Sequence, residues 1–225
     1  MVAGGAWHSV ALLSDGTVWA WGYNGDGELG NGNNTNSNVP VQVQNLRGII
    51  AIAAGRYYSL ALRSDGTVWG WGSNNYGQLG NGSVSYANLP VQVVNSDFTP
   101  LTGIKALAAD DQHTLALKTD GTLLAWGRNN EGQLGIGNFI GYSAFPVAVQ
   151  TLTQVKAISA GYLYSMAVKT DGTIWTWGSN TNGELGLGTT TNVNTPTQIT
   201  ALSGITAVSG NQLSLALKSD GTVWA

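Results

Sequence analysis

The chain has only two histidines, His8 and His113, and imidazole is the side chain best suited to metal binding and proton transfer near neutral pH. Both occupy one slot of an internal repeat, and the other repeats place tyrosine or leucine in that slot, at Tyr58, Tyr164 and Leu213. Neither a metal ligand nor a general base could be exchanged for leucine without losing its chemistry. We therefore expect each imidazole to pack at the start of a strand, with its polar atom bonded to the backbone.

Carboxylates and glycine-rich segments are the other candidates for chemistry. An aspartate before Gly-Thr bonds backbone N–H groups in a turn, whereas a catalytic pair needs two carboxylates side by side; the chain has five such aspartates, Asp15, Asp65, Asp120, Asp171 and Asp220. Residues 24–28 lack the alternating oxygen ligands and the late glutamate of a calcium loop. No glycine-rich segment leads into a helix with Lys-Ser/Thr, and the chain has no cysteine. We predict no enzyme, no cofactor and no metal site.

The composition narrows the classes of partner. Of 225 residues, 9% are charged and 43% are hydrophobic, and the formal net charge is -3. No run of lysine and arginine supplies the basic surface that nucleic-acid binders need. No apolar stretch reaches the roughly 20 residues of a membrane span. We therefore expect neither nucleic-acid binding nor membrane insertion. The compartment stays open, with an extracellular or bacterial cell-surface location favoured.

The chain is built from internal repeats. Asp-Gly-Thr recurs about every 50 residues, and the same phrases surround each copy. Asp-Gly between alternating apolar residues predicts a hairpin with a type I′ turn, so Ser-Leu-Ala-Leu (59–62) and Thr-Val-Trp-Gly-Trp (67–71) are expected to pair as antiparallel strands. The repeat units are predicted at residues 5–54, 55–109, 110–160, 161–209 and 210–225, the last of them incomplete.

Alternation within each unit indicates stacked sheets. Trp69 and Trp71 point to one face of their strand, while Val68 and Gly70 point to the other. Large side chains of one sheet can then pack against small residues of the next. Four short strands in a unit of this length describe a β-propeller blade. A β-solenoid ranks second, because its coils repeat every 20–30 residues or so and need no tight hairpin in every unit.

The recurring phrases follow the pattern Ala-Ala-Gly-x-x-His/Tyr-Ser-Leu-Ala-Leu-x-x-Asp-Gly-Thr-Val-Trp-x-Trp-Gly-x-Asn-x-x-Gly-Gln/Glu-Leu-Gly. This pattern resembles the repeat of the regulator of chromosome condensation family, and it spans nearly the whole chain. The resemblance implies a seven-bladed β-propeller. We therefore expect an all-β fold, with residues 1–225 forming one partial propeller domain of about four and a half four-stranded blades. The open blade edges would permit self-association.

Proteins that resemble this repeat include a guanine-nucleotide exchange factor, a plant ultraviolet-B receptor, an inhibitor of β-lactamase and bacterial surface proteins, so the fold does not fix the function. Our first hypothesis is a non-catalytic interaction or scaffold module that binds a protein partner through one face of the propeller. One alternative is an enzyme regulator, either an exchange factor or an enzyme inhibitor. The other is a carbohydrate-binding cell-surface domain.

The candidate partner-binding residues lie where the repeats differ. Counting strand directions places the Gly-x-x-His/Tyr gaps and the Asn-x-x-Gly loops at one end of the blades, opposite the Asp-Gly turns. The residues in these positions mix aromatic and polar types, as protein interfaces do. They are Trp7, Arg56, Tyr57, Asp111, Gln112, Tyr162, Leu163, Asn211, Gln212, Asp26, Tyr76, Glu131 and Asn182.

Overall fold

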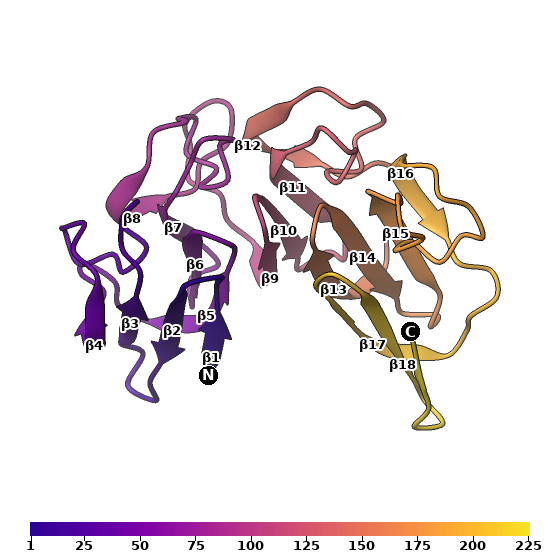
Figure 1. Ribbon diagram of the computed structural model, residues 1–225, viewed down its shortest axis with the longest axis horizontal. Helices are drawn as coiled ribbons and strands as arrows, with labels where there is room; N and C mark the ends of the chain where they lie inside the picture. The colour runs from indigo at the N-terminus through magenta and orange to yellow at the C-terminus, as the bar shows by residue number, and fades with distance from the viewer.

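The computed structural model describes residues 1–225, which form five antiparallel sheets arranged side by side in an open arc (Figure 1). Each sheet is one blade, with its first strand on the inner side of the arc. In the four-stranded blades the fourth strand lies on the outer side (Figure 1). All the regular elements are strands, which confirms the predicted all-β class. No helix has the length and apolar character that crossing a membrane demands.

The strands within every blade follow one another in sequence order. Blade 1 contains β1 (Val2–Gly4), β2 (His8–Leu12), β3 (Val18–Gly22) and β4 (Ser37–Gln42). Blade 2 contains β5 (Ile49–Ala54), β6 (Tyr58–Arg63), β7 (Val68–Gly72) and β8 (Ala87–Gln92). Blade 3 contains β9 (Ile104–Asp110), β10 (His113–Lys118), β11 (Leu123–Arg128) and β12 (Tyr142–Ala148). Blade 4 contains β13 (Val155–Gly161), β14 (Tyr164–Lys169), β15 (Ile174–Gly178) and β16 (Val193–Gln198). Blade 5 has three strands, β17 (Ile205–Gly210), β18 (Ser214–Lys218) and β19 (Val223–Trp224).

The blades and the predicted repeat units are out of phase by one strand. β5 closes the unit 5–54, but in the structure it is the first strand of blade 2, where it pairs with β6. A predicted unit thus combines three strands of one blade with the inner strand of the next. The boundary of each unit falls at the end of the inner strand, next to the loop where the repeats vary.

The Asp-Gly turns differ from the predicted type I′ geometry. In the first turn, N of Leu13 donates to O of Thr17 (2.9 Å) and N of Gly16 donates to O of Leu13 (3.1 Å), so the loop holds three residues. Gly16 has a positive φ of 79°, but Asp15 does not, whereas type I′ needs a positive φ at both. The carboxylate of Asp15 accepts bonds from N and Oγ1 of Thr17 (2.9 and 2.7 Å), which confirms the predicted turn role of the aspartate. The loop is therefore a type I turn followed by a left-handed glycine.

One tryptophan of the third strand packs against the preceding blade. Trp71 of β7 is fully buried in a cluster with Val10 and Ala20 of blade 1, and its Nε1 donates to the backbone O of Glu28 at 2.8 Å. The next two blades repeat this bond, from Trp126 to O of Gln78 (2.8 Å) and from Trp177 to O of Gln133 (2.9 Å). The prediction that large residues of one sheet pack on small residues of another is confirmed.

The last blade leaves apolar side chains uncovered. Leu213, Leu215, Leu217, Val223 and Trp224 are all exposed on or beside β18 and β19. Exposed apolar area of this kind favours association, and the self-association expected through open blade edges stays a prediction.

Both histidines are buried, but their partners are not the predicted backbone atoms. Nε2 of His8 lies 2.9 Å from Oγ of Ser59, and Nε2 of His113 lies 2.9 Å from Oγ of Ser165, so each ring bonds a serine of the following blade. Burial lowers the pKa of His8 to about 4 and that of His113 to about 3, because a buried imidazolium loses its hydration. The two rings are therefore neutral structural links between blades at pH 7.

Candidate functional site

The loops after the inner strands meet at one end of the blades and are tied to one another through the backbone. N of Ala6 donates to O of Arg56 (3.0 Å), and N of Arg56 donates to O of Asp111 (3.0 Å). On the other side, N of Tyr162 donates to O of Asn211 (2.7 Å). These bonds join the variable loops of blades 1, 2 and 3 and those of blades 4 and 5, and we call the loops together the rim.

This rim encloses an open groove of about 470 Å³ at the centre of the arc. The glycines Gly4, Gly5 and Gly55 supply part of its wall, so the backbone itself is accessible there. Six of the predicted residues line the groove together: Trp7, Arg56, Asp111, Tyr162, Asn211 and Gln212. Counting strand directions in the sequence therefore placed residues from five different blades at one site.

An acidic pair with one arginine forms the charged part of the groove. The side chain of Asp111 is 1% exposed, and its Oδ1 lies 3.5 Å from Nη1 of Arg56, which is 43% exposed. Neither carboxylate oxygen of Asp111 accepts a hydrogen bond. Burial raises the pKa of Asp111, although the charge of Arg56 opposes this, and burial raises the pKa of Asp110 to about 6. The groove thus holds carboxylates that would gain from a basic partner group.

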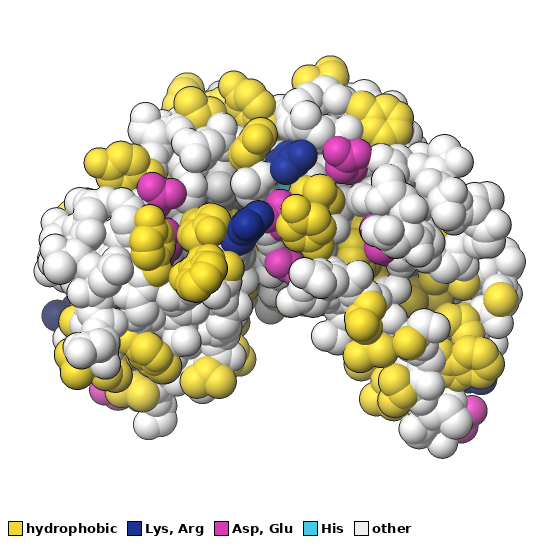
Figure 2. Space-filling model, viewed as in Figure 1, with side chains coloured by type: hydrophobic (Ala, Val, Ile, Leu, Met, Phe, Trp, Pro, Cys, Tyr) yellow, Lys and Arg dark blue, Asp and Glu magenta, His cyan; other side chains and the backbone are white.

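A second hollow, of about 510 Å³, adjoins the groove over the first two blades. It is lined by Trp7, Tyr23, Asp26 and Tyr57, so Trp7 stands between the two hollows. The rings of Tyr23 and Tyr57 meet edge to face with centroids 6.1 Å apart, and the guanidinium of Arg56 lies 5.4 Å from the centroid of Tyr57. Figure 2 shows hydrophobic side chains gathered on this face beside basic groups. We call Trp7, Tyr23 and Tyr57 the aromatic cluster.

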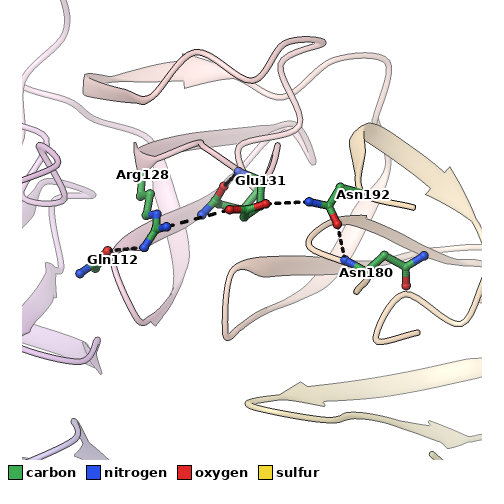
Figure 3. A network of polar contacts seen from close by, with 6 residues as sticks. Gln112, Arg128, Glu131, Asn180 and Asn192 are labelled. Carbon is green, nitrogen blue, oxygen red and sulfur yellow. Dashed lines mark hydrogen bonds and ion pairs between the residues drawn. The ribbon is translucent and has the colours of Figure 1, made fainter. Parts of the chain in front are cut away.

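Arg128 belongs to a network of blade 3 that reaches blade 4 through Glu131 and Asn192 (Figure 3). Its Nη1 donates to Oε1 of Gln112 (3.1 Å), and its Nη2 lies 4.0 Å from Oε1 of Glu131. Nδ2 of Asn192 donates to Oε2 of Glu131 at 2.6 Å. The guanidinium also lies 5.4 Å from the ring centroid of Tyr76. The side chains of Gln112, Tyr76 and Glu131 therefore contact Arg128, and they do not line the groove.

Two more predicted residues, Leu163 and Asn182, also lie apart from both hollows. Leu163 has a φ of 63°, and its carbonyl accepts a bond from N of Ser179 (2.9 Å), so its position serves the loop. Asn182 is exposed, and its N and Nδ2 donate to the carboxylate of Glu184 (2.9 and 3.1 Å). Neither is among the residues that line the groove.

Three residues of the site escaped the sequence analysis: Tyr23, Asp110 and Arg128. Tyr23 and Arg128 share a slot directly after Trp-Gly, and Ser73 and Ser179 fill it in other blades. That slot varies as much as the two-residue gaps do, so comparison of the repeats could have found it. Asp110 ends β9 in the slot that other repeats fill with glycine, as at Gly55 and Gly161. The carboxylate in that slot could therefore have indicated Asp110 as a residue of the site.

The two histidine–serine pairs deserve comparison with a nucleophile and its base. Oγ of Ser165 donates to the backbone O of Gln133 (2.8 Å), and Oγ of Ser59 donates to the backbone O of Glu28 (3.2 Å). Both serines are completely buried. A hydroxyl that donates to a carbonyl and is closed to substrate cannot serve as a nucleophile. The structure also has no group of three or more His, Asp or Glu side chains placed to hold a metal ion.

Comparisons with known proteins agree on one architecture. A family model described as the RCC1-like domain matches residues 1–225. The chain is 35% identical over 134 residues to the human probable E3 ubiquitin-protein ligase HERC6, which covers 55% of this chain and 13% of that protein. It is 39% identical over 99 residues to the dog X-linked retinitis pigmentosa GTPase regulator, which covers 43% of this chain and 10% of that protein.

The structure is also similar to that of Prp20p from Saccharomyces cerevisiae, a protein described by its binding to Gsp1p and histones. The two superimpose with a TM-score of 0.85 and 26% sequence identity over 96% of this chain and 55% of Prp20p. The chain therefore spans about half the length of this solved protein, and about a tenth of the length of the two sequence relatives. The predicted propeller is confirmed.

Proposed function

The chain belongs to the RCC1-like domain family, and on that premise we propose that it is a non-catalytic interaction module that binds a protein partner through the rim face. The aromatic cluster carries this proposal. Trp7 is 64% exposed, although tryptophan is among the residues that gain most from burial. Exposed aromatic rings beside an arginine have the composition of interface hot spots.

The geometry of the rim favours partner binding over the alternative that its loop residues differ between repeats without a function. The cluster rests on loops held by backbone hydrogen bonds between blades, so its rings need little ordering when a partner arrives. Its neighbour Asp110 offers a partly buried carboxylate in the groove. A partner with an apolar segment followed by a basic side chain would cover the aromatic cluster and reach this carboxylate.

Regulation of a small GTPase is the second candidate, and the likeness to Prp20p favours it because that protein binds Gsp1p. The GTPase regulator of dog is a relative by sequence as well. Enzyme inhibition, carbohydrate binding and a bacterial cell-surface location stay predictions, and the relatives named above come from human, dog and yeast.

Affinity measurements with rim variants test the proposal. We expect Trp7→Ala and Tyr57→Ala each to weaken binding of the partner by about 1–4 kcal/mol, as hot-spot aromatics do, without loss of the fold. Lys118→Ala is the control, because Lys118 ends β10 beside an Asp-Gly turn at the opposite end of the blade, where it pairs with Asp120 at 3.1 Å. Gsp1p and core histones serve as the first immobilised probes.

The outcomes show which face of the blades binds and, separately, what binding does to the partner. A partner that binds the wild type and the Lys118 variant equally, but binds the two aromatic variants weakly, supports the rim face. Strong loss with Lys118→Ala alone would mean that the opposite face binds. Nucleotide release from Gsp1p, measured with a fluorescent nucleotide, decides the second candidate, because an exchange factor accelerates it and a plain binding module does not.

A further inference from the structure

The second hollow of the site, which we call the aromatic hollow, has the wall composition of a cation site. It is lined by the three rings of the aromatic cluster, Trp7, Tyr23 and Tyr57, and by the carboxylate of Asp26. The rings of Tyr23 and Tyr57 are inclined to each other by 62°, so they form two walls that meet at an angle. The face of an aromatic ring is negative and attracts a cation. Three rings and one carboxylate around a single hollow therefore favour a positively charged ligand.

The part of this wall that blade 1 supplies is held by local contacts. N of Tyr23 donates to O of Trp7 at 2.8 Å, and N of Asp26 donates to Oε2 of the buried Glu28 at 3.0 Å. The phenol of Tyr23 lies over Gly25, where a Cβ would collide with it. Blades 1 and 2, which share the hollow, are both four-stranded sheets. The walls are therefore in place before a ligand arrives, and this lowers the cost of ordering them on binding.

The charges around the aromatic hollow are complementary to a cation. The carboxylate of Asp26 forms no ion pair and accepts no hydrogen bond from another residue. The guanidinium of Arg56 lies 5.4 Å from the ring centroid of Tyr57, but Arg56 lines the groove and not the hollow. Its charge is balanced by Asp111, whose Oδ1 lies 3.5 Å from Nη1 of Arg56. The hollow thus keeps the unpaired negative charge of Asp26.

Comparison of the repeats shows that the fold does not require aromatic rings in these slots. The slot of Trp7 and Tyr57 holds glutamine in blades 3 and 5, at Gln112 and Gln212. The slot of Tyr23 holds serine in blades 2 and 4. Three rings and a carboxylate meet at the interface of blades 1 and 2 and at no later interface of the chain. Blade packing therefore does not explain the aromatic hollow, whereas ligand binding does.

We propose that the aromatic hollow binds a trimethylated ammonium group carried by a lysine side chain of the protein partner, an inference that rests on the proposed function. An unmodified ammonium has three N–H donors, and the hollow offers it mostly ring surface in exchange for its strong hydration. Trimethylation removes the donors and keeps the positive charge, so the methyl groups can pack on the rings. The volume of about 510 Å³ lies within the usual range of ligand sites and admits the end of a long side chain.

A titration with three peptides tests this proposal on the complete 225-residue chain. The probe is a pentapeptide with one central lysine between glycines, followed through the indole N–H signals in ¹H–¹⁵N NMR spectra. Its lysine is unmodified, trimethylated, or replaced by a neutral isostere with carbon in place of the nitrogen. We expect the trimethylated peptide to bind about tenfold more tightly than each of the other two, because it alone combines the charge with an apolar surface. Equal affinity for the trimethylated and neutral peptides would overturn the proposal, since apolar contact alone would then explain the binding.

Choline tests the source of the cation. It carries the same trimethylammonium group but has no peptide backbone. We expect it to bind more weakly than the trimethylated peptide. Binding of choline as tight as that of the peptide would overturn the assignment to a lysine side chain.

Variants that use residues found in other repeats locate the site with little risk to the fold. Trp7→Gln and Tyr57→Gln, which introduce the residue type of Gln112 in the same slot, should each weaken binding of the trimethylated peptide about fivefold. Asp26→Asn should weaken it about threefold at low salt. Tyr86→Ser is the control, because Tyr86 is 58% exposed and lines neither hollow, and it should change the affinity less than about twofold. Undiminished binding to the two glutamine variants would overturn the proposal.

The outcome can be distinguished from that of the proposed function. Binding of a protein that Trp7→Ala weakens, together with equal affinity for the three peptides, would overturn the cation site and leave the interaction module standing. Preference for the trimethylated peptide, together with protein binding that Trp7→Ala leaves unchanged, would support the cation site and count against the rim face as the surface for that protein.

Discussion

Replacement of Trp177 by phenylalanine should reduce the free energy of unfolding by about 2–3 kcal/mol. The ring of Trp177 is fully buried at the interface between blades 3 and 4, and its Nε1 donates to O of Gln133 at 2.9 Å. Loss of that hydrogen bond accounts for about 1 kcal/mol. The smaller ring leaves a gap equivalent to one or two buried methylene groups, which adds about 1–2 kcal/mol. The carbonyl of Gln133 keeps its bond from Ser165, so no further cost for an unpaired acceptor arises.

Trp175→Phe is the matched control in the same strand. Trp175 is half-buried, and its Nε1 donates to Oγ1 of the nearby Thr173 at 3.1 Å, so its bond joins residues of one blade. We expect a loss below about 1 kcal/mol for this variant. Urea unfolding followed by far-ultraviolet circular dichroism measures both, because fluorescence would lose one of its reporters. Equal losses for the two variants, or a loss below 1 kcal/mol for Trp177→Phe, would refute the argument that these indoles hold the blades together.

Two further substitutions test the buried histidine and the turn glycine. His113→Tyr should flatten the dependence of stability on pH: the buried imidazole, with its pKa lowered to about 3, stays neutral when the unfolded chain takes up a proton near pH 6.5. The contribution of His113 to the stability should therefore be complete above pH 6.5 and fall by up to about 1.4 kcal/mol per pH unit below it. A variant with the same slope in urea midpoints as the wild type between pH 7 and 4 would contradict this. Gly66→Ala should cost about 1–2 kcal/mol, because Gly66 has a φ of 81° and a Cβ would lie 3.0 Å from N of Gly103. Gly4→Ala, whose Cβ would meet nothing within 4 Å, should melt within a degree or two of the wild type.

The blades could be predicted from the sequence because each local pattern agrees with the others. The two-residue period of Trp69 and Trp71, the Asp-Gly turn and the repeat length all require short antiparallel strands. The same reasoning placed Trp7, Arg56 and Tyr162 at one end of the blades, since strand direction alternates along the chain. The turn type escaped prediction because Asp-Gly suits both a type I′ turn and the last two positions of a three-residue loop. Only the pairing of Leu13 with Thr17 distinguishes them.

The polar contacts between blades could not be read from the sequence. The bond between Asn192 and Glu131 joins residues 61 positions apart, and its existence depends on how two separate loops bend. The bonds from His8 to Ser59 and from His113 to Ser165 depend in the same way on the distance between blades. A repeat fixes which slots vary, but the partners of a side chain in a variable slot come from the neighbouring blade.

The bond from each indole to the preceding blade gives the arc a direction. Glu28, Gln78 and Gln133 offer their carbonyls before the tryptophans that bind them have been synthesised, since each acceptor lies more than 40 residues nearer the N-terminus than its donor. A ribosome releases the chain in that order, so every new blade finds a completed surface on which to dock. Growth of the fold can therefore keep pace with translation, and a gene that gains a repeat at its 3′ end extends the same series of contacts without changing the blades already made.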